Sequence, residues 1–169
     1  MLQTLTSDAT FGPGPTFNTD VGFDIVLSPD KKAFTATFSG LEVIIQGTSA
    51  APIGTRIFSF SIPLSGTDPG QEIPFTVQGN VLSEKEAAAH LAFSVNDQTT
   101  MVDFPVNSDS SFVQQLNYKA LNAADARITV FLLASRDSRS DSPVQVNVAS
   151  IDVDLNQQGA KWTPRSGTA

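Results

Sequence analysis

"SEKEAAAHLAFSVND", residues 83–97, decides between a helical and a β reading of this part of the chain. Read as a helix, it would begin with Ser83 as N-cap and Glu86 as the capping-box partner, and the three alanines would favour it. Read as a strand, residues 87–95 alternate between apolar side chains and a more polar set that contains His90. The aromatic and β-branched residues near its end are weak helix formers. We therefore predict a strand over 87–95, preceded by a single helical turn, with His90 on the more polar side.

The same two-residue period continues outward from this stretch. "VGFDIVL" (21–27) and "AFTATFS" (33–39) are joined by "SPDKK", in which Pro29 and Asp30 favour a turn. These segments predict a β-hairpin. Further strands are expected at 41–46, 56–64, 72–79, 127–135 and 143–155. The strand at 127–135 is apolar on both sides, which predicts a central strand covered on both faces. Pro63 predicts an edge or a bulge for the strand at 56–64.

The last strand, "PVQVNVASIDVDL" (143–155), changes phase along its length. Valines share one side up to Val148, and apolar residues share the opposite phase from Ile151 onward. One extra residue near Ala149 and Ser150 would bring both sets to the same face, which predicts a β-bulge.

About eight or nine short strands with turns between them predict an all-β fold, an antiparallel two-sheet β-sandwich with jelly-roll-like connections. We expect three parts. Residues 1–19, rich in Pro and Gly, form an extended N-terminal arm, residues 20–155 form the sandwich, and residues 156–169 form a polar C-terminal tail.

Composition narrows the classes of function. The 169 residues include 17 acidic and 10 scattered basic ones, for a net charge of −7, which argues against nucleic-acid binding. The absence of cysteine excludes disulfides and cysteine-ligated metals. No run approaches the ~18–20 apolar residues of a membrane span. The 12 Phe, against one Trp and one Tyr, indicate an aromatic core rather than an aromatic binding surface.

Catalytic equipment is sparse. His90 is the sole histidine, and no G-x-S-x-G motif accompanies it, so a serine hydrolase is disfavoured. Asp152 and Asp154 lie two apart on one predicted strand, about 7 Å from each other, a spacing that a glycosidase would use. The same spacing is typical of a solvated edge strand. The sequence predicts no enzyme and no required cofactor.

Two polar segments contain the oxygen ligands that calcium prefers. Asp109 lies in "NSDSS", and Asp137 and Asp141 lie in "SRDSRSDS". Neither segment has the spacing of an EF-hand, and two arginines in the second would repel a cation. Calcium at Asp109, Asp137 or Asp141 is one alternative, and polar surface loops are the other.

Carbohydrate binding is a second class of function. Sugar-binding surfaces commonly stack Trp or Tyr against the ring, and this chain offers only Trp162, in the tail, and Tyr118. Recognition of a glycan would therefore use polar loops, for example around Gln114, Gln115 and Asn117.

The termini suggest a third class, because an extended arm can add a strand to a neighbouring molecule. Trp162, between Lys161 and Arg165, would anchor such an arm on an acidic partner. A tail without a structural role is the alternative.

"LSPDKKAFTATFSGLEV" and "FTVQGNVLSEKEAAAHLAFSV", within residues 27–95, resemble an uncharacterised family of secreted fungal and bacterial β-sandwich proteins. That family has cysteines near its third strand, and this chain has none. The resemblance implies a β-sandwich and an extracellular setting, with no activity attached.

These observations together predict a non-enzymatic structural or interaction module that self-associates, as a homo-oligomer or within a protein assembly, through its extended termini. The alternative is a carbohydrate-binding module or lectin that uses polar loops, assisted by calcium. A carboxylate-driven enzyme is a third reading. The Ser- and Thr-rich composition favours a secreted or cell-surface location. A cytoplasmic location stays open as the alternative.

Overall fold

The computed structural model describes residues 8–16, 19–47, 52–121 and 124–157, which form eleven strands and no helix. The strands are β1 (Thr10–Phe11), β2 (Gly22–Leu27), β3 (Ala33–Ser39), β4 (Glu42–Ile45), β5 (Ile53–Ser65), β6 (Glu72–Ser83), β7 (Ala87–Val95), β8 (Gln98–Phe104), β9 (Ser108–Lys119), β10 (Asp125–Arg136) and β11 (Val144–Asp154). Within these described ranges there is thus no helix that could cross a membrane.

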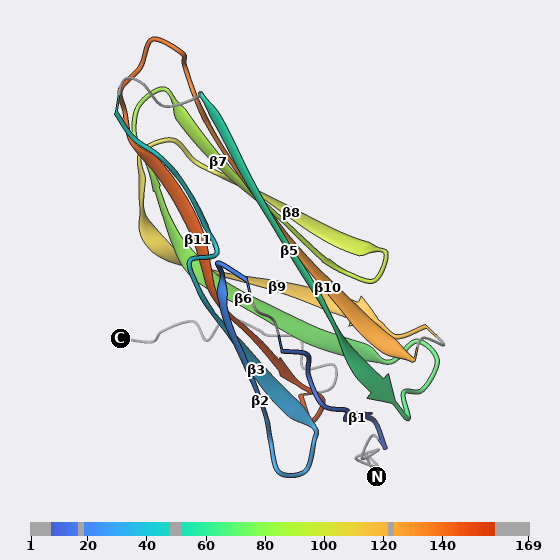
Figure 1. Ribbon diagram of the computed structural model, residues 1–169. Helices are drawn as coiled ribbons and strands as arrows, with labels where there is room; N and C mark the ends of the chain where they lie inside the picture. Colours follow the sequence, from blue (N-terminus) through green and yellow to red (C-terminus); the bar gives the residue numbers. More distant parts are fainter. Residues whose placement is uncertain (1–7, 17–18, 48–51, 122–123, 158–169) are drawn as a thin grey trace, which may run out of the picture.

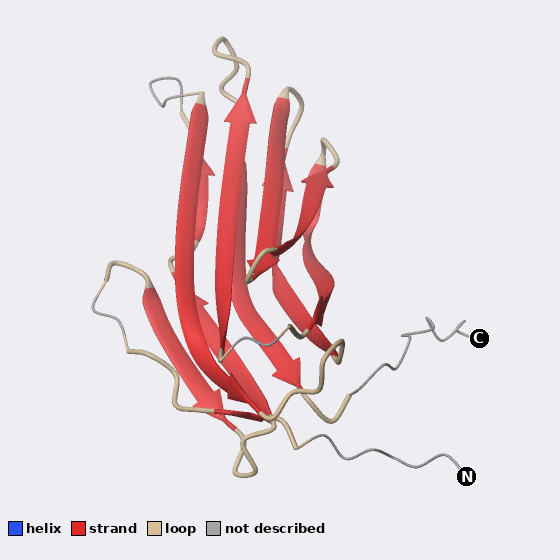
Figure 2. Ribbon diagram, turned by 90° about the vertical axis from the view of Figure 1, so that its right-hand side faces the viewer, coloured by secondary structure: helices blue, strands red, loops and turns tan. Residues whose placement is uncertain are grey.

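The strands form two antiparallel sheets packed face to face (Figures 1 and 2). One sheet has the order β1-β5-β10-β7-β8. The other has the order β2-β3-β11-β6-β9, with β4 also pairing with β11. From β5 to β11 the chain crosses to the opposite sheet after every strand except β7. In this part of the chain, β7 and β8 are the one pair of consecutive strands that form a hairpin within one sheet. The predicted antiparallel β-sandwich is confirmed, with eleven strands instead of eight or nine because β1, β8 and β9 were not predicted.

Within residues 83–97, the strand β7 covers the predicted range, 87–95. In β7, side chains alternate between buried and half-buried positions from Ala87 to Val95, and His90 is on the half-buried side. The predicted helical turn before it is wrong. The backbone N–H of Ala87 donates to Glu84 O at 3.1 Å, and Glu86 has a left-handed φ of 67°. The left-handed conformation of Glu86 closes a tight turn, through which the chain passes from β6 in one sheet to β7 in the other.

The predicted hairpin is confirmed as β2 and β3, with Leu27 opposite Phe34. Its turn is fixed by Asp30, whose Oδ1 accepts hydrogen bonds from Ser28 Oγ at 2.6 Å and from the Lys32 backbone N–H at 3.1 Å. These bonds are the local side-chain to backbone contacts that favour Asp in turns.

Strand β10 is central, as predicted, because it lies between β5 and β7. The prediction that both of its faces are covered is wrong, since Phe131 and Leu133 on the outer face are only half-buried.

Strand β5 is close to an edge, because β1 pairs only with its last two residues, Leu64 and Ser65. This position agrees with the presence of Pro63.

The core between the sheets is rich in phenylalanine, as the composition predicts. Six of the phenylalanines are among its buried residues: Phe11, Phe34, Phe58, Phe60, Phe75 and Phe93. Two core residues, Ala9 and Phe11, come from the segment expected to be an N-terminal arm, and the Phe11 ring packs edge-on to Phe34 at 4.8 Å. The described part of that segment thus contributes to the core instead of lying clear of it.

Candidate functional site

The outer surface of the six-stranded sheet carries many polar side chains, and we call this surface the polar face. Alternation along the strands places these side chains outward, opposite the core residues. They come from β3, β6, β9 and β11 and are Thr35, Thr37, Thr76, Gln78, Asn80, Asp109, Ser111, Gln115, Asn117, Gln145, Asn147, Ser150, Asp152 and Asp154.

A β-bulge in β11 makes this face continuous. The register between β11 and β6 shifts between Val148 and Ser150, which confirms the predicted bulge. Before the bulge Asn147 points outward with the odd-numbered residues, and after it Asp152 points outward with the even-numbered ones. Without the extra residue, Ala149, the second set would turn into the core.

Gly79 allows the backbones to approach at the bulge. A Cβ built on Gly79 would lie 2.0 Å from the backbone oxygen of Asn147 and 2.8 Å from Cζ of Phe112. Any side chain at this position would therefore separate β6 from β11 beside the site.

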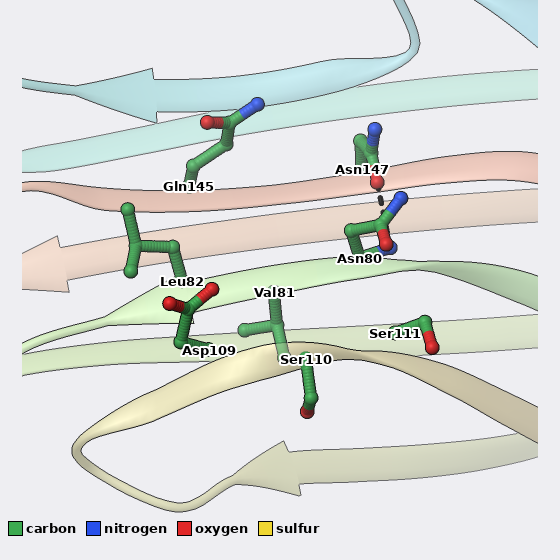
Figure 3. A pocket seen from close by; sticks show the side chains of 8 residues that line it. All are labelled: Asn80, Val81, Leu82, Asp109, Ser110, Ser111, Gln145 and Asn147. Atoms are coloured by element: carbon green, nitrogen blue, oxygen red, sulfur yellow. Dashed lines mark hydrogen bonds between the residues drawn. The ribbon is translucent and has the colours of Figure 1, made fainter.

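One hollow on the polar face is lined by residues of β11, β6 and β9, and we call it the asparagine hollow (Figure 3). Its volume is about 410 Å³. Asn147 Oδ1 accepts a hydrogen bond from the backbone N–H of Asn80 at 2.7 Å, so the Asn147 amide is held in one orientation. Gln145 Nε2 lies 3.4 Å from Glu42 Oε2. In Figure 3 the amide groups of Asn80 and Asn147 lie next to each other, and Asp109 lies across the hollow from Gln145.

A second hollow of about 330 Å³ lies on the other side of the bulge, and we call it the aspartate hollow. At its centre the Asp152 carboxylate accepts hydrogen bonds from Thr35 Oγ1 at 2.6 Å, Gln78 Nε2 at 3.0 Å and Ser150 Oγ at 3.4 Å. Hydrogen bonds from three neighbouring side chains stabilise the charged carboxylate and fix its position.

The predicted carboxylate pair lies at the same place. Asp154 Oδ1 accepts the backbone N–H of Asn156 at 2.8 Å, and Asp152 is held by its three side-chain donors. Both groups therefore act as hydrogen-bond acceptors within the fold. A glycosidase role for the pair stays a prediction.

Two carboxyl groups outside the hollows have shifted pKa values. The Arg56 guanidinium, 2.6 Å away, donates a hydrogen bond to Asp20 and lowers its pKa. Hydrogen bonds from the Ser28 hydroxyl and the Lys32 backbone N–H lower the pKa of Asp30. Both groups are exposed, so they contribute to surface turns and not to a buried reactive centre.

The calcium candidates are spread over separate elements. Asp109 was expected in a loop, but it lies in β9, opposite Leu82 of β6. Asp137 and Asp141 lie in the turn between β10 and β11, where Asp137 Oδ1 accepts the backbone N–H of Arg139 at 2.9 Å. The described part of the chain contains no group of three or more acidic or histidine side chains arranged for a metal. Calcium binding stays a prediction.

The other sequence candidates are placed as follows. Tyr118 is buried, with its ring 6.1 Å from Phe75, so it is not available to stack on a sugar. Gln115 and Asn117 lie on the polar face in β9, where Gln115 Nε2 donates to Asn117 Oδ1 at 2.7 Å. They belong to a strand and not to the expected polar loop, and so does their neighbour Gln114. Lys161, Trp162 and Arg165 lie outside the described residues.

His90 is on the outer face of the other sheet. Its Nδ1 lies 2.6 Å from Oδ1 of Asp103, directly opposite on β8, and Leu133 is opposite on β10. The pair joins two neighbouring strands at the surface, and its cross-strand neighbours do not include a serine.

Sequence reasoning missed the polar side chains on β6 and the first half of β11, above all Gln78, Asn80, Gln145 and Asn147. A signal was present, because Gln78, Gln145 and Asn147 occupy alternate positions on the polar side of predicted strands. Asn80 continues this alternation one residue beyond the predicted strand at 72–79.

Comparison with known proteins adds little to this description of the site. No family model matches the chain, and no curated protein matches it. Among solved structures, the carbohydrate-binding module TmCBM61 in complex with beta-1,4-galactotriose is similar at a TM-score of 0.34 and 12% sequence identity, covering 73% of this chain and 88% of that one. A likeness this low carries no argument about function.

Proposed function

We propose that this protein is a non-catalytic binding module that holds a neutral oligosaccharide on the polar face. The observation that carries the proposal is the pair of hollows on one surface, each lined by amide, hydroxyl and carboxylate groups and each containing a side chain fixed by hydrogen bonds, Asn147 in one and Asp152 in the other.

The chemistry of these groups fits a sugar. Each sugar hydroxyl donates one hydrogen bond and accepts others, and amides and carboxylates supply both kinds of partner. Side chains already held in place lose little conformational freedom when a ligand binds. No Lys or Arg lines either hollow, and Lys119, which is on the same face, lies at the end of β9; this disfavours phosphate and other anions as ligands. The residues that define the polar face include no aromatic ring, which disfavours flat apolar ligands.

The shape of the site predicts weak binding. The hollows are shallow and open, so a ligand keeps much of its surface in water, and no aromatic ring covers the sugar. We expect dissociation constants of about 1 mM, a binding free energy of about −4 kcal/mol, which is sufficient for a module that binds a repeating polymer at several points. Calcium assistance and a secreted or cell-surface location stay predictions from the sequence.

Calorimetric titration with a panel of neutral trisaccharides, galacto-, manno-, gluco- and xylo-configured, tests the proposal. Asn80→Ala removes an exposed amide from the asparagine hollow and is expected to weaken binding about fivefold, the value of one hydrogen bond near 1 kcal/mol. Thr99→Ala, exposed on the other sheet, is the matched control and should bind like wild type. Absence of binding by the whole panel and by longer oligomers of the same sugars would contradict the proposal.

A further inference from the structure

The edge strands of the sandwich differ greatly in length. The five-stranded sheet ends at β1 and β8, and the six-stranded sheet ends at β2 and β9. Strand β9 has 12 residues, against two in β1, seven in β8 and six in β2. Native edges are usually protected by shortness, charge or proline. From Ser110 to Tyr118, β9 contains no charged residue and no proline.

The hydrogen bonds at the end of β9 show which backbone groups face its open edge. The backbone groups of Ala120 bond toward β6, with N to Gln71 O at 2.8 Å and O from the Gly70 N–H at 3.0 Å. The N–H and C=O of Lys119 instead bond to the side-chain amide of Gln98, at 2.8 and 2.7 Å. Even-numbered residues of β9 therefore face β6, and odd-numbered residues face away from it.

This alternation continues through the strand, because the β6–β9 register has no shift from end to end. Ser111, Val113, Gln115 and Asn117 thus direct their N–H and C=O groups to the open edge. All four side chains are exposed, and Val113 is 67% accessible to solvent. Gln98 covers this edge only at Lys119.

We propose that a second copy of this chain pairs with the open edge of β9, antiparallel and with Gln114 of the two copies opposite each other on the two-fold axis. The inference is independent of oligosaccharide binding. It concerns the edge of the sheet and not its face.

The positions of two charges set this register. Asp109 and Lys119 lie at equal distances along the strand on either side of Gln114. With Gln114 on the axis, Asp109 of each copy lies opposite Lys119 of the other, and their side chains are on the same face. Between them Ser111 lies opposite Asn117 and Val113 opposite Gln115, and each of these pairs exchanges two backbone hydrogen bonds.

The charge pattern of this edge fits a second copy of the same chain, although both copies carry the same net charge. The chain has a net charge of −7, so two copies repel each other over most of their surfaces. The middle of β9 is neutral, and its two ends carry opposite charges that become complementary only when the strand meets itself antiparallel. A shift of the register by two residues would separate both ion pairs.

The consequence is a single sheet that runs through both copies. The polar faces then become neighbouring parts of one surface, because side chains on paired strands keep to the same side of a continuous sheet. Asp109 and Ser111, which line the asparagine hollow, lie beside the seam.

The chain has no cysteine, so one introduced thiol reports the register directly. Gln114 opposite Gln114 is a non-hydrogen-bonded pair with a Cα–Cα distance of about 4.5 Å, within reach of a disulfide. Mild oxidation of Gln114→Cys should give a covalent dimer in high yield, whereas Thr99→Cys, exposed on β8, should not. Equal cross-linking of both variants, or none in either, would overturn the proposal.

Light scattering along a dilution series provides the second readout on the full chain. Wild type should show twice the 17.9 kDa chain mass at high concentration. Asp109→Lys should raise the dimer dissociation constant at least tenfold, and the swap Asp109→Lys with Lys119→Asp should restore it. Gln115→Pro, which removes an N–H from the open edge, should give a folded monomer.

A monomer at all concentrations would overturn the proposal. So would an oligomer that is unaffected by these variants and is lost when residues 156–169 are removed, since that result would assign assembly to the C-terminal tail.

Discussion

Asn147 Oδ1 accepts the hydrogen bond of the Asn80 backbone N–H at 2.7 Å, so a side chain of β11 joins β6 immediately before the bulge. The contact has two roles in this account. It stabilises the sheet where the regular ladder is interrupted, and it orients an amide in the asparagine hollow.

The first prediction separates the acceptor from the rest of the side chain. Asn147→Asp keeps an acceptor at the same position and should retain wild-type stability, whereas Asn147→Ala should lower the free energy of unfolding by about 1 kcal/mol. Urea unfolding measures both. Equal losses in the two variants would show that the Asn80 hydrogen bond is not what Asn147 contributes.

The second prediction concerns the close approach of β6 and β11. Gly79→Ala places a Cβ 2.0 Å from the Asn147 backbone oxygen and should destabilise the protein by about 3 kcal/mol, the upper end of the usual cost of overpacking. Gly22→Ala is the control, because its Cβ meets Ser39 Cβ at 3.0 Å on an edge strand that is able to shift. Thermal unfolding that ranks the two variants equally would contradict this role for Gly79.

The third prediction tests the bulge itself. Deletion of Ala149 forces one phase on the whole of β11, so Asp152 and Asp154 would turn into the core, and the variant should not fold. Ala149→Ser keeps the extra residue and should fold normally. Circular dichroism and solubility distinguish the outcomes, and a stable, cooperative deletion variant would show that the bulge is dispensable.

The fourth prediction is a dependence on pH. The pKa of Asp20 is lowered in the folded state by Arg56, so its contribution to stability is complete above the ordinary value of 3.8 and is lost as the pH falls through the lowered folded value. Asp20→Asn should therefore have a lower Tm than wild type near neutral pH, and the difference should shrink in acid. The effect should be small, since the pair is at the surface. A difference that grows in acid would contradict the direction of the shift.

The sequence predicted those parts of the fold in which burial and periodicity agree. The strand at 87–95, the hairpin around Asp30 and the bulge at Ala149 were all readable, because each depends on neighbouring residues. The helical turn before β7 was not. The capping-box residues Ser83 and Glu86 fit a tight turn as well as a helical turn. The tight turn forms because the chain passes from one sheet to the other at this point.

Strands β8 and β9 were missed because they are edge strands with little apolar surface. In β9, Phe112, Leu116 and Tyr118 keep the period of two, but Gln114 interrupts it, and the polar residues between them have the composition of a loop. The polar side of each strand was readable from the sequence, but the continuous polar face was not, because it depends on the strand order that brings β11 next to β6.

The most direct test of the central claim is ¹H–¹⁵N NMR mapping of the protein during titration with the tightest-binding trisaccharide of the panel. Chemical-shift changes should concentrate at Gln78, Asn80, Gln145, Asn147 and their neighbours on β6, β9 and β11, while the shifts of His90 and Thr99 on the opposite sheet should stay unchanged. Shifts confined to the five-stranded sheet, or none at saturating sugar, would contradict it.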